Sequence, residues 1–470
     1  MSQTVFERYA PQKSTILEAL APSVNRPFWL DDVAQVTKYP RYRGPSTFDL
    51  AIVGGGYLGL WTAILAKERN PNRSVILLEG QNVGWAASGR NGGFCDASLT
   101  HGEENGRARW PEEYEALDSL GRQNLNEIEA AIERYSIDCE FERTGALTVA
   151  TEPYQEKELR GEGYLSGEEV QQEVSSPTYL AGVWDKDSVA MLHPAKLVME
   201  LARVATELGV KIFERSPITG IEPPTELDNG RVHLRTAAGP VSASRVVLAT
   251  NAFPSLLKRY RFHTVPVYDY ALMTEPLTSQ QMDSIGWKNR QGISDMANQF
   301  HYYRLSRDNR ILFGGYDAIY NYGGRVDSKY DDRPQSFERL ASHFFTTFPQ
   351  LEGVTFTHRW GGAIDSSTQF CAFYGQAREG KIGYASGFTG LGVGATRFAA
   401  NVLLDRIEGL HTERTALRMV REVPLPFPPE PFAYAGVQAT RWSMDQADHN
   451  QGKRNFILRT LDKLGLGFDS

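Results

Sequence analysis

A glycine motif set between a strand and a helix constrains the fold of this chain more than any other feature. Residues 48–53, FDLAIV, form a short apolar run, and Gly54, Gly56 and Gly59 follow it in G-x-G-x-x-G spacing. A helical pattern comes next, and a second apolar run then ends at Glu79. Buried parallel strands are near-continuous apolar runs, and a strand–helix–strand unit joins them through a right-handed crossover. We therefore predict an α/β fold with a parallel sheet.

The same motif predicts a phosphate site. The first glycine of such a turn permits a tight bend, the second lets a pyrophosphate approach the backbone, and the third lets the helix pack on the strand. The N–H groups that begin the helix attract anions. Glu79 lies twenty residues beyond Gly59, where a carboxylate accepts hydrogen bonds from ribose hydroxyls. The residues expected to contact a dinucleotide, either NAD or FAD, are Gly54, Gly56, Tyr57, Leu58, Gly59 and Glu79.

The composition is that of an ordinary globular protein and argues against several other classes. The 470 residues are 41% hydrophobic and carry a net charge of −7, without the basic stripe of a nucleic-acid-binding protein. The three cysteines, Cys95, Cys139 and Cys371, have neither zinc-site nor disulfide spacing. The charge-free stretch 50–66 is short for a membrane span and is broken by glycines. Residues 1–20 lack a signal-peptide pattern, so we expect a cytoplasmic protein without a metal site, a nucleic-acid partner or a membrane span.

Strand-like and helical stretches alternate in a way that predicts two interleaved domains. The expected dinucleotide-binding domain is discontinuous and consists of residues 47–135, 189–261 and 357–412. The expected substrate domain, an α+β unit built on an antiparallel sheet, consists of residues 136–188 and 262–356. The two ends of the chain are interpreted as an N-terminal extension, residues 1–46, and a C-terminal extension, residues 413–470.

A second glycine-rich loop, AASGRNGGF at residues 86–94, follows soon after Glu79. Further along come RTGALTVATEP (143–153), MLHPAKL (191–197), VVLATNAF (246–253), YYRLSRDNRILFGG (302–315) and GYASGFTGLGVGATRFAANVL (383–403). Together with the glycine motif, these segments resemble the D-amino-acid-oxidase-type FAD-dependent oxidoreductases over roughly residues 46–412. This superfamily includes glycine and sarcosine oxidases and γ-glutamylputrescine oxidase, and the glycine-rich loop is most similar to that of the last.

The resemblance implies FAD as the cofactor, held by a Rossmann-like FAD-binding domain with an interleaved substrate domain. The loop at 86–94 then runs beside the cofactor. The helix that follows Gly387–Val393 presents its N-terminus to the flavin, where it stabilises negative charge that appears on reduction. The further residues expected to contact FAD are Ser88, Arg90, Asn91, Gly92, Gly93, Gly390, Leu391, Gly392 and Val393.

Two departures from the sarcosine-oxidase relatives bear on the chemistry. Those relatives attach their flavin through a cysteine, whereas Cys371 is displaced from that position by several residues, so we expect non-covalent FAD. They also use a lysine near flavin N5 to activate oxygen, and this chain has Leu312 there. Other branches of the superfamily are oxidases without that lysine, so oxidase and dehydrogenase behaviour both stay open.

The resemblance implies oxidation of a C–N bond of an amine or amino acid, by hydride transfer to flavin N5, hydrolysis of the imine and reoxidation by O2. Our candidate catalytic residues are Tyr302, Arg304 and Tyr270, with Arg304 as a clamp for a substrate carboxylate. His193 is interpreted as a histidine that caps a helix start. Further candidates for contact with the substrate are Tyr268, His301 and Tyr303, although alternation along a strand would turn about half of such side chains into the core or to the surface. Arg359 and Trp360 are candidates for approaching the flavin.

Two other functions remain open from the sequence. One is an FAD dehydrogenase of a hydroxy acid or amine that passes electrons to a quinone or a protein. The other is a dinucleotide-binding protein without redox chemistry. The oligomeric state is not indicated.

Overall fold

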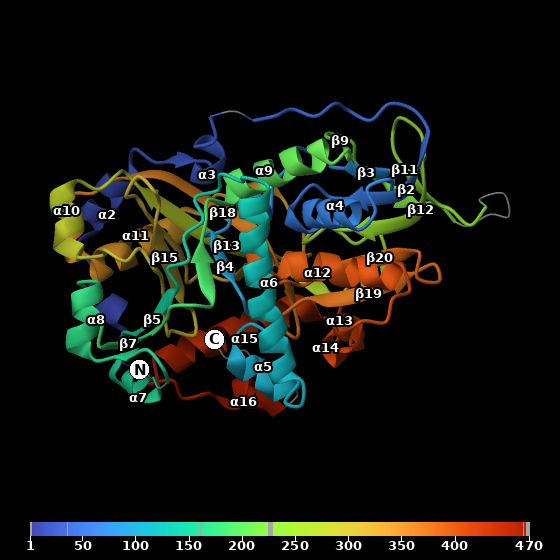
Figure 1. The fold of residues 1–470 in the computed structure, drawn as a ribbon. Coiled ribbons are helices and arrows are strands. Elements are labelled where there is room, and N and C mark those ends of the chain that lie inside the picture. The colour runs from blue at the N-terminus through green and yellow to red at the C-terminus, as the bar shows by residue number, and fades with distance from the viewer. Residues whose placement is uncertain (1, 35, 160, 224–228, 464, 467–470) are drawn as a thin grey trace.

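Two large sheets stand side by side and divide the molecule into halves (Figure 1). The computed structural model describes residues 2–34, 36–159, 161–223, 229–463 and 465–466. In Figure 1 the mainly parallel sheet lies on the right and the mainly antiparallel sheet on the left. This arrangement confirms the predicted α/β fold, with a second sheet for the substrate side.

The first sheet has the order β10-β11-β12-β2-β3-β9, and β20 and β19 extend it beside the end of β12. Strands β12, β2, β3 and β9 pair in parallel. Leu50, Ala51 and Ile52 in β2 have no exposed surface, as expected for a strand covered on both faces. The strands are β2 (Ser46–Val53), β3 (Val75–Leu78), β9 (Lys211–Phe213), β10 (Gly220–Ile221), β11 (Val232–Arg235), β12 (Val241–Leu248), β19 (Phe373–Ala377) and β20 (Ile382–Ser386).

Long helices cover one face of this sheet (Figure 1). α4 packs between α9 and α12, and α6 packs on α12. At the start of α9, His193 Nδ1 accepts a hydrogen bond of 3.1 Å from the N–H of Lys196, which confirms the expected helix-start histidine. The helices are α4 (Tyr57–Arg69), α6 (Tyr114–Arg134), α9 (Pro194–Glu207) and α12 (Gly392–Ile407).

The second sheet has the order β1-β18-β13-β16-β15-β14-β5-β7-β6, with β17 beside β13. Helix α11 covers one of its faces with Phe337 and Phe344. β18 pairs with β13 along its whole length, so residues 356–367 belong to this sheet and not, as we expected, to the dinucleotide-binding domain. The elements are β1 (Val24–Asn25), β5 (Ala146–Ala150), β6 (Tyr164–Leu165), β7 (Ala181–Asp185), β13 (Thr264–Thr274), β14 (Gly292–Asp295), β15 (His301–Leu305), β16 (Ile311–Gly315), β17 (Ile319–Tyr320), β18 (Phe356–Ser367) and α11 (Pro334–Thr347).

The remaining elements are short or lie in the two terminal extensions. β4 (Phe94–Asp96) and β8 (Val189–Met191) form a separate antiparallel pair. The helices are α1 (Val5–Arg8), α2 (Lys13–Leu20), α3 (Phe28–Asp31), α5 (Glu103–Arg109), α7 (Pro153–Glu158), α8 (Gly167–Glu173), α10 (Ser279–Ile285), α13 (Glu413–Ala416), α14 (Arg418–Arg421), α15 (Phe432–Asp448) and α16 (Phe456–Lys463). Among the helices that the structure describes, none is long and apolar enough to cross a membrane.

The two terminal extensions meet near α15. The N–H and Oγ of Ser2 donate hydrogen bonds of 3.1 and 2.8 Å to the carbonyl of His449. Phe6 in α1 is buried, and its ring stacks on that of His343 in α11. Val5 N donates to Glu152 Oε1 at 2.5 Å, so α1 joins the end of α15 to the antiparallel sheet side.

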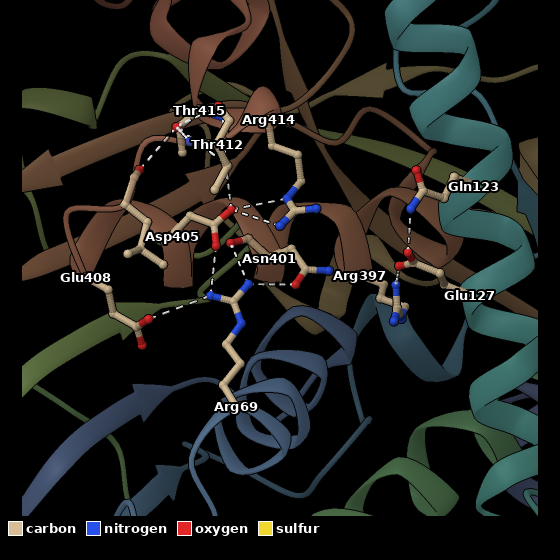
Figure 2. A network of polar contacts seen from close by, with 11 residues as sticks. Arg69, Gln123, Glu127, Arg397, Asn401, Asp405, Glu408, Thr412, Arg414 and Thr415 are labelled. Atoms are coloured by element: carbon tan, nitrogen blue, oxygen red, sulfur yellow. Dashed lines mark hydrogen bonds and ion pairs between the residues drawn. The ribbon is translucent and has the colours of Figure 1, made fainter.

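A buried carboxylate ties α4 to α12 (Figure 2). Asp405 of α12 is almost fully buried, and it forms ion pairs with Arg69 of α4 at 2.8 Å and with Arg414 of α13 at 3.0 Å. Thr412 Oγ1 donates to the same carboxylate at 2.9 Å. Arg69 ends α4 and Asp405 lies near the end of α12, so this network joins the two helices at the ends away from their glycine turns.

Candidate functional site

A cavity of about 1930 Å³ opens between the two sheets. Its walls are the glycine turn before α4, the loop 84–92, the turn before α12, and the facing strands β13, β15 and β18. Side chains of α15 and α16 close a further side. Both predicted glycine loops therefore reach one cavity, together with strands of the substrate sheet.

The first glycine turn has the geometry that its motif predicts. Gly54 has φ +114°, and a Cβ there would stand 2.3 Å from the carbonyl oxygen of Ala249. Gly56 is the N-cap of α4 and, with Tyr57 and Leu58, lines the cavity. A Cβ on Gly59 would lie 2.0 Å from the carbonyl oxygen of Gly54, so this glycine is needed for helix packing and does not itself line the cavity.

Glu79 lines the cavity and also fixes the glycine turn. Its Oε2 accepts a hydrogen bond of 2.7 Å from the N–H of Gly55. Its Oε1 accepts from the N–H of Gln81 at 2.7 Å and from Trp85 Nε1 at 3.1 Å. Burial raises the pKa of Glu79, and these three donors oppose that rise. A carboxylate oxygen has two acceptor sites, so Oε2 retains one for a ligand hydroxyl.

The loop at 86–94 is held in shape by its own polar groups. Asn91 Nδ2 donates to the carbonyls of Ala87 and Ser88 at 3.0 and 3.2 Å, and its Oδ1 accepts from the N–H of Gly93 at 2.9 Å. Ser88 Oγ accepts from the N–H of Tyr57 at 3.1 Å, which joins the loop to the start of α4. Of the residues expected to contact FAD, Ser88, Asn91 and Gly92 line the cavity and Gly93 does not.

Arg90 lines the cavity but is already paired with other groups of the protein. Its guanidinium donates to Asp331 Oδ2 at 2.6 Å, to the carbonyl of Trp85 at 2.9 Å and to that of Gly361 at 3.2 Å. Trp360 Nε1 donates to the carbonyl of Arg90 at 2.9 Å. Arg90 thus connects the glycine-rich loop to β18 and holds the two halves of the cavity together.

A buried carboxylate that sequence reasoning missed shapes the second glycine turn. Asp365 Oδ2 accepts from the N–H of Gly387 at 2.6 Å and from Ser386 Oγ at 3.0 Å. Burial raises its pKa to about 6. The first turn of α12 has no side-chain cap, and an uncapped helix start attracts anions. The predicted residues that line the cavity here are Gly390, Leu391, Gly392 and Val393.

The second sheet places a carboxyl–phenol pair on the cavity wall. Tyr302 Oη of β15 donates to Asp269 Oδ2 of β13 at 2.6 Å, and both residues line the cavity. The edge of the Tyr302 ring meets that of Phe94, with centroids 5.9 Å apart. Burial raises the pKa of Asp269 to about 6 and that of Tyr302 well above its usual value. This pair brings a proton-binding group next to the glycine-rich loop.

Strand alternation explains why Asp269 was missed and why Tyr270 was misplaced. Tyr270 borders the cavity, but its ring packs on Phe337 of α11 and its hydroxyl donates to the carbonyl of Tyr330 at 2.9 Å. The neighbouring Asp269 faces the other way, toward the cavity. The candidates that belong with Tyr270 to the aromatic side against α11, and not to the Asp269 side, are Tyr268, His301 and Tyr303.

The structure does not place Arg304 where a substrate clamp would be. Its side chain is fully enclosed beneath the glycine-rich loop, where the guanidinium lies over the ring of Trp29. It donates to the carbonyls of Leu192 and Gly93 at 2.6 and 3.3 Å, and it does not line the cavity. Arg304 therefore supports the loop from behind, and its substrate role is corrected to a structural one.

The other candidates divide between wall and core. Trp360 lines the cavity, whereas Arg359 points to Ser23 Oγ at 3.1 Å. Leu312 packs in the cluster that contains Trp360. Cys371 is buried outside the cavity lining, and burial raises its pKa to about 12. Over the described stretches of the chain, no group of three or more His, Cys, Asp or Glu side chains is arranged to hold a metal ion.

Comparisons with known proteins agree with this geometry. The model of the family of FAD-dependent oxidoreductases called DAO matches residues 49–406. A probable oxidoreductase, OrdL, of Haemophilus influenzae is 29% identical over 402 residues, which are 82% of this chain and 88% of that protein. Gamma-glutamylputrescine oxidoreductase of Escherichia coli K12 is 30% identical over 383 residues, 77% of this chain and 84% of that protein.

Solved structures have the same fold at low sequence identity. Glycine oxidase from Geobacillus kaustophilus superposes with a TM-score of 0.65 and 18% identity, over 80% of this chain and 99% of that one. L-amino acid deaminase from Proteus vulgaris gives a TM-score of 0.62 and 17% identity, over 81% and 94%. With its glycine turns, its two sheets and the cavity between them, this chain belongs to the DAO family of FAD-dependent oxidoreductases.

Proposed function

We propose that this protein oxidises a C–N bond of an amine or amino acid at an FAD held without a covalent bond in the cavity. The observation that carries the proposal is the Asp269–Tyr302 pair, which shares one cavity with both glycine turns. The names of gamma-glutamylputrescine oxidoreductase and glycine oxidase, two proteins to which the chain is similar, support a nitrogen-bearing substrate.

The residues of the cavity fit an extended dinucleotide. A Cβ at Gly54 or Gly56 would stand 2.3 Å from the carbonyl oxygen of Ala249 or 2.8 Å from Ser88 Oγ, so these positions need glycine for the turn at which a pyrophosphate would approach the start of α4. Loop 86–92 and the uncapped start of α12 suit the flavin end. Cys371 stands outside the lining, which favours non-covalent binding. Bound FAD would supply a two-electron acceptor.

Asp269 and Tyr302 are assigned the task of holding the substrate nitrogen. An alkylammonium of pKa about 10.4 must lose a proton before its lone pair can assist hydride departure, at a cost of about 4.6 kcal/mol at pH 7. A buried cavity disfavours the charged ammonium and so reduces that cost. Asp269 accepts an N–H of the amine and orients it, while Tyr302 keeps the carboxylate in place through its 2.6 Å hydrogen bond.

The test is anaerobic reduction of the bound flavin by a panel of amines and amino acids, followed by admission of air. Bleaching of the yellow colour by an amine, with prompt hydrogen peroxide in air, is the expected result. Asp269→Asn is expected to raise KM for the amine about tenfold or more, because a charged hydrogen bond contributes about 1.5–3 kcal/mol. Tyr268→Phe, on the opposite face of β13, is the matched control and should leave KM unchanged.

The other outcomes of the panel separate the remaining functions. A reduced flavin that persists in air would replace O2 with a quinone or protein acceptor, an alternative that the apolar Leu312 favours. Reduction by hydroxy acids alone would move the reaction from C–N to C–O bonds. A protein that no compound bleaches would refute the proposed oxidation and leave dinucleotide binding without redox chemistry.

A further inference from the structure

Helix α15 forms part of the cavity wall although it lies beyond residues 49–406, which the family model matches. Eight of its residues line the cavity, and six of them recur at helical spacing, namely Ala433, Gly436, Val437, Thr440, Arg441 and Met444. This spacing puts them on one face of the helix. The C-terminal extension therefore contributes its own side chains to whatever occupies the cavity.

Arg441 is the charged residue on this face. Its Nε is buried and has no hydrogen-bond partner among the described residues. Its NH1 reaches Gln438 Oε1 only at 3.4 Å, and its NH2 stands 3.8 Å from Asp317 Oδ1. The side chain as a whole keeps 28% of its surface exposed and lines the cavity, so its weakly paired terminal nitrogens are suited to an anionic ligand.

Asp317 does not by itself neutralise the charge of Arg441, because it is shared with two other arginines. Its carboxylate is already bound by Arg333 at 3.0 Å and by Arg339 at 2.6 Å, and neither of these arginines lines the cavity. Three guanidinium groups thus surround one carboxylate, so the cluster has a net positive charge, to which Arg441 contributes from the cavity wall. The other two arginines of the lining are paired, Arg90 with Asp331 and Arg122 with Asp118.

The cavity carries the opposite charge a short distance away. Asp269 faces the cavity and accepts hydrogen bonds from Tyr302 Oη and from the N–H of Tyr270, with no ion pair to a basic side chain of the described residues, and the charge of Asp317 contributes to its raised pKa. Asp317 therefore lies within electrostatic reach of Asp269 and contacts the arginine cluster on its other side. A cation site and an anion site consequently share one region of the cavity.

We propose that Arg441 binds a carboxylate of the substrate, so that the protein selects amines that also carry an acid group over simple alkylamines. This inference rests on the proposed oxidation of a C–N bond and names its substrate class. The ammonium end meets Asp269 and Tyr302, and the carboxylate end meets the guanidinium that α15 supplies.

The experiment compares matched substrates with and without the carboxylate: alanine with ethylamine, sarcosine with dimethylamine, and 4-aminobutyrate with propylamine. Flavin reduction by the wild-type holoenzyme should favour at least one acid over its partner. Arg441→Met should lower kcat/KM for that acid about 10- to 100-fold, leave its amine partner unchanged, and be partly compensated in Arg441→Lys. Arg459→Met on α16, an arginine outside the cavity lining, is the matched control and should behave as wild type.

Binding of ligands that cannot be oxidised tests the carboxylate site independently of the proposed oxidation. Trimethylglycine has no hydrogen on its nitrogen, and tetramethylammonium is its counterpart without the carboxylate. Calorimetry on the holoenzyme should detect trimethylglycine more strongly than tetramethylammonium, and Arg441→Met should abolish the difference. That result supports the carboxylate site even if no compound reduces the flavin. Equal binding of both probes, or equal loss of acid and amine substrates in Arg441→Met with unchanged flavin content, would overturn it.

Discussion

Asp269 lines the cavity, and its partial burial makes the charged form of its carboxyl group unfavourable. Its carboxyl group is partly buried in the cavity wall, and this burial raises its pKa from 3.8 to about 6. The folded protein therefore binds this proton more tightly than the unfolded chain does. Stability from this group is present at low pH and is lost as the pH rises from about 4 to about 6.

We expect Asp269→Asn to stabilise the substrate-free protein at neutral pH. The amide keeps the hydrogen bond with Tyr302 but carries no charge to desolvate. A shift of about two pKa units corresponds to about 3 kcal/mol, so a gain of about 1–3 kcal/mol in the free energy of unfolding is expected at pH 7.5, and almost none at pH 4. Urea unfolding at both pH values measures the difference. A variant that is less stable than wild type at pH 7.5 would contradict the argument.

On the scale of elements, Asp405 of α12 stabilises the packing of α12 against α4 and α13 through its ion pairs with Arg69 and Arg414. Removing one partner of a buried ion pair costs about 3–5 kcal/mol, and here the effect is smaller because Arg69 and Arg414 keep about a quarter of their side chains exposed. We expect Asp405→Asn to lower the free energy of unfolding by about 1–3 kcal/mol.

The same substitution should also lower the ratio of FAD to purified protein, since it loosens the packing of α4 on α12 and both helices begin at the glycine turns that we propose hold FAD. The control is Glu207→Gln, which removes an exposed ion pair within α9 and should change stability by less than about 0.5 kcal/mol. If Asp405→Asn lost stability yet kept full flavin content, the network would serve the fold alone.

Elements that repeat a local rule were predictable from the sequence. The first strand, its glycine turn and α4 follow one another within a short stretch, so residues 48–69 carry their whole signal locally. Proline at the start of α9 and the glycines before α12 are similar cases. In each of these, neighbours in the chain decide the conformation.

Partners distant in the sequence were not predictable. β18 belongs to the second sheet because it pairs with β13, about ninety residues earlier. Arg304 looked free in the sequence, yet its partners Gly93 and Leu192 come from remote segments. Side chains alternate along β13, so Asp269 lies on the opposite face from the buried Tyr268 and Tyr270. The sequence does not say which of the two faces is buried, and for that reason Asp269 was not identified. That α15 forms a wall of the cavity was also not predictable, because a helical sequence pattern does not show which part of the fold the helix packs against.

On the scale of the whole molecule, the N-terminal segment secures the C-terminal wall of the cavity. Ser2 bonds to His449 at the end of α15, and Phe6 packs against His343. Removing residues 2–8 should loosen α15 without disturbing either glycine turn. We expect faster amide hydrogen exchange in residues 432–448 and a several-fold higher KM, with unchanged flavin content.

Leu17→Ser, on the exposed side of α2, provides the control for that deletion and should leave exchange in α15 as in wild type. Exchange rates in α15 that stay the same after the deletion would show that the C-terminal wall holds itself in place. A loss of flavin would instead assign the N-terminal segment to the integrity of the whole fold.

The contact between Ser2 and His449 also sets an order of events during synthesis. These residues are 447 positions apart, so Ser2 meets this partner only after α15 has been made. At about 5–20 residues per second this wait lasts roughly 20–90 seconds. Until residues 334–347 have been made, the apolar side chains of α1 and α2 are also without the helix α11 on which they pack, and they are a part of the nascent chain on which a chaperone would act.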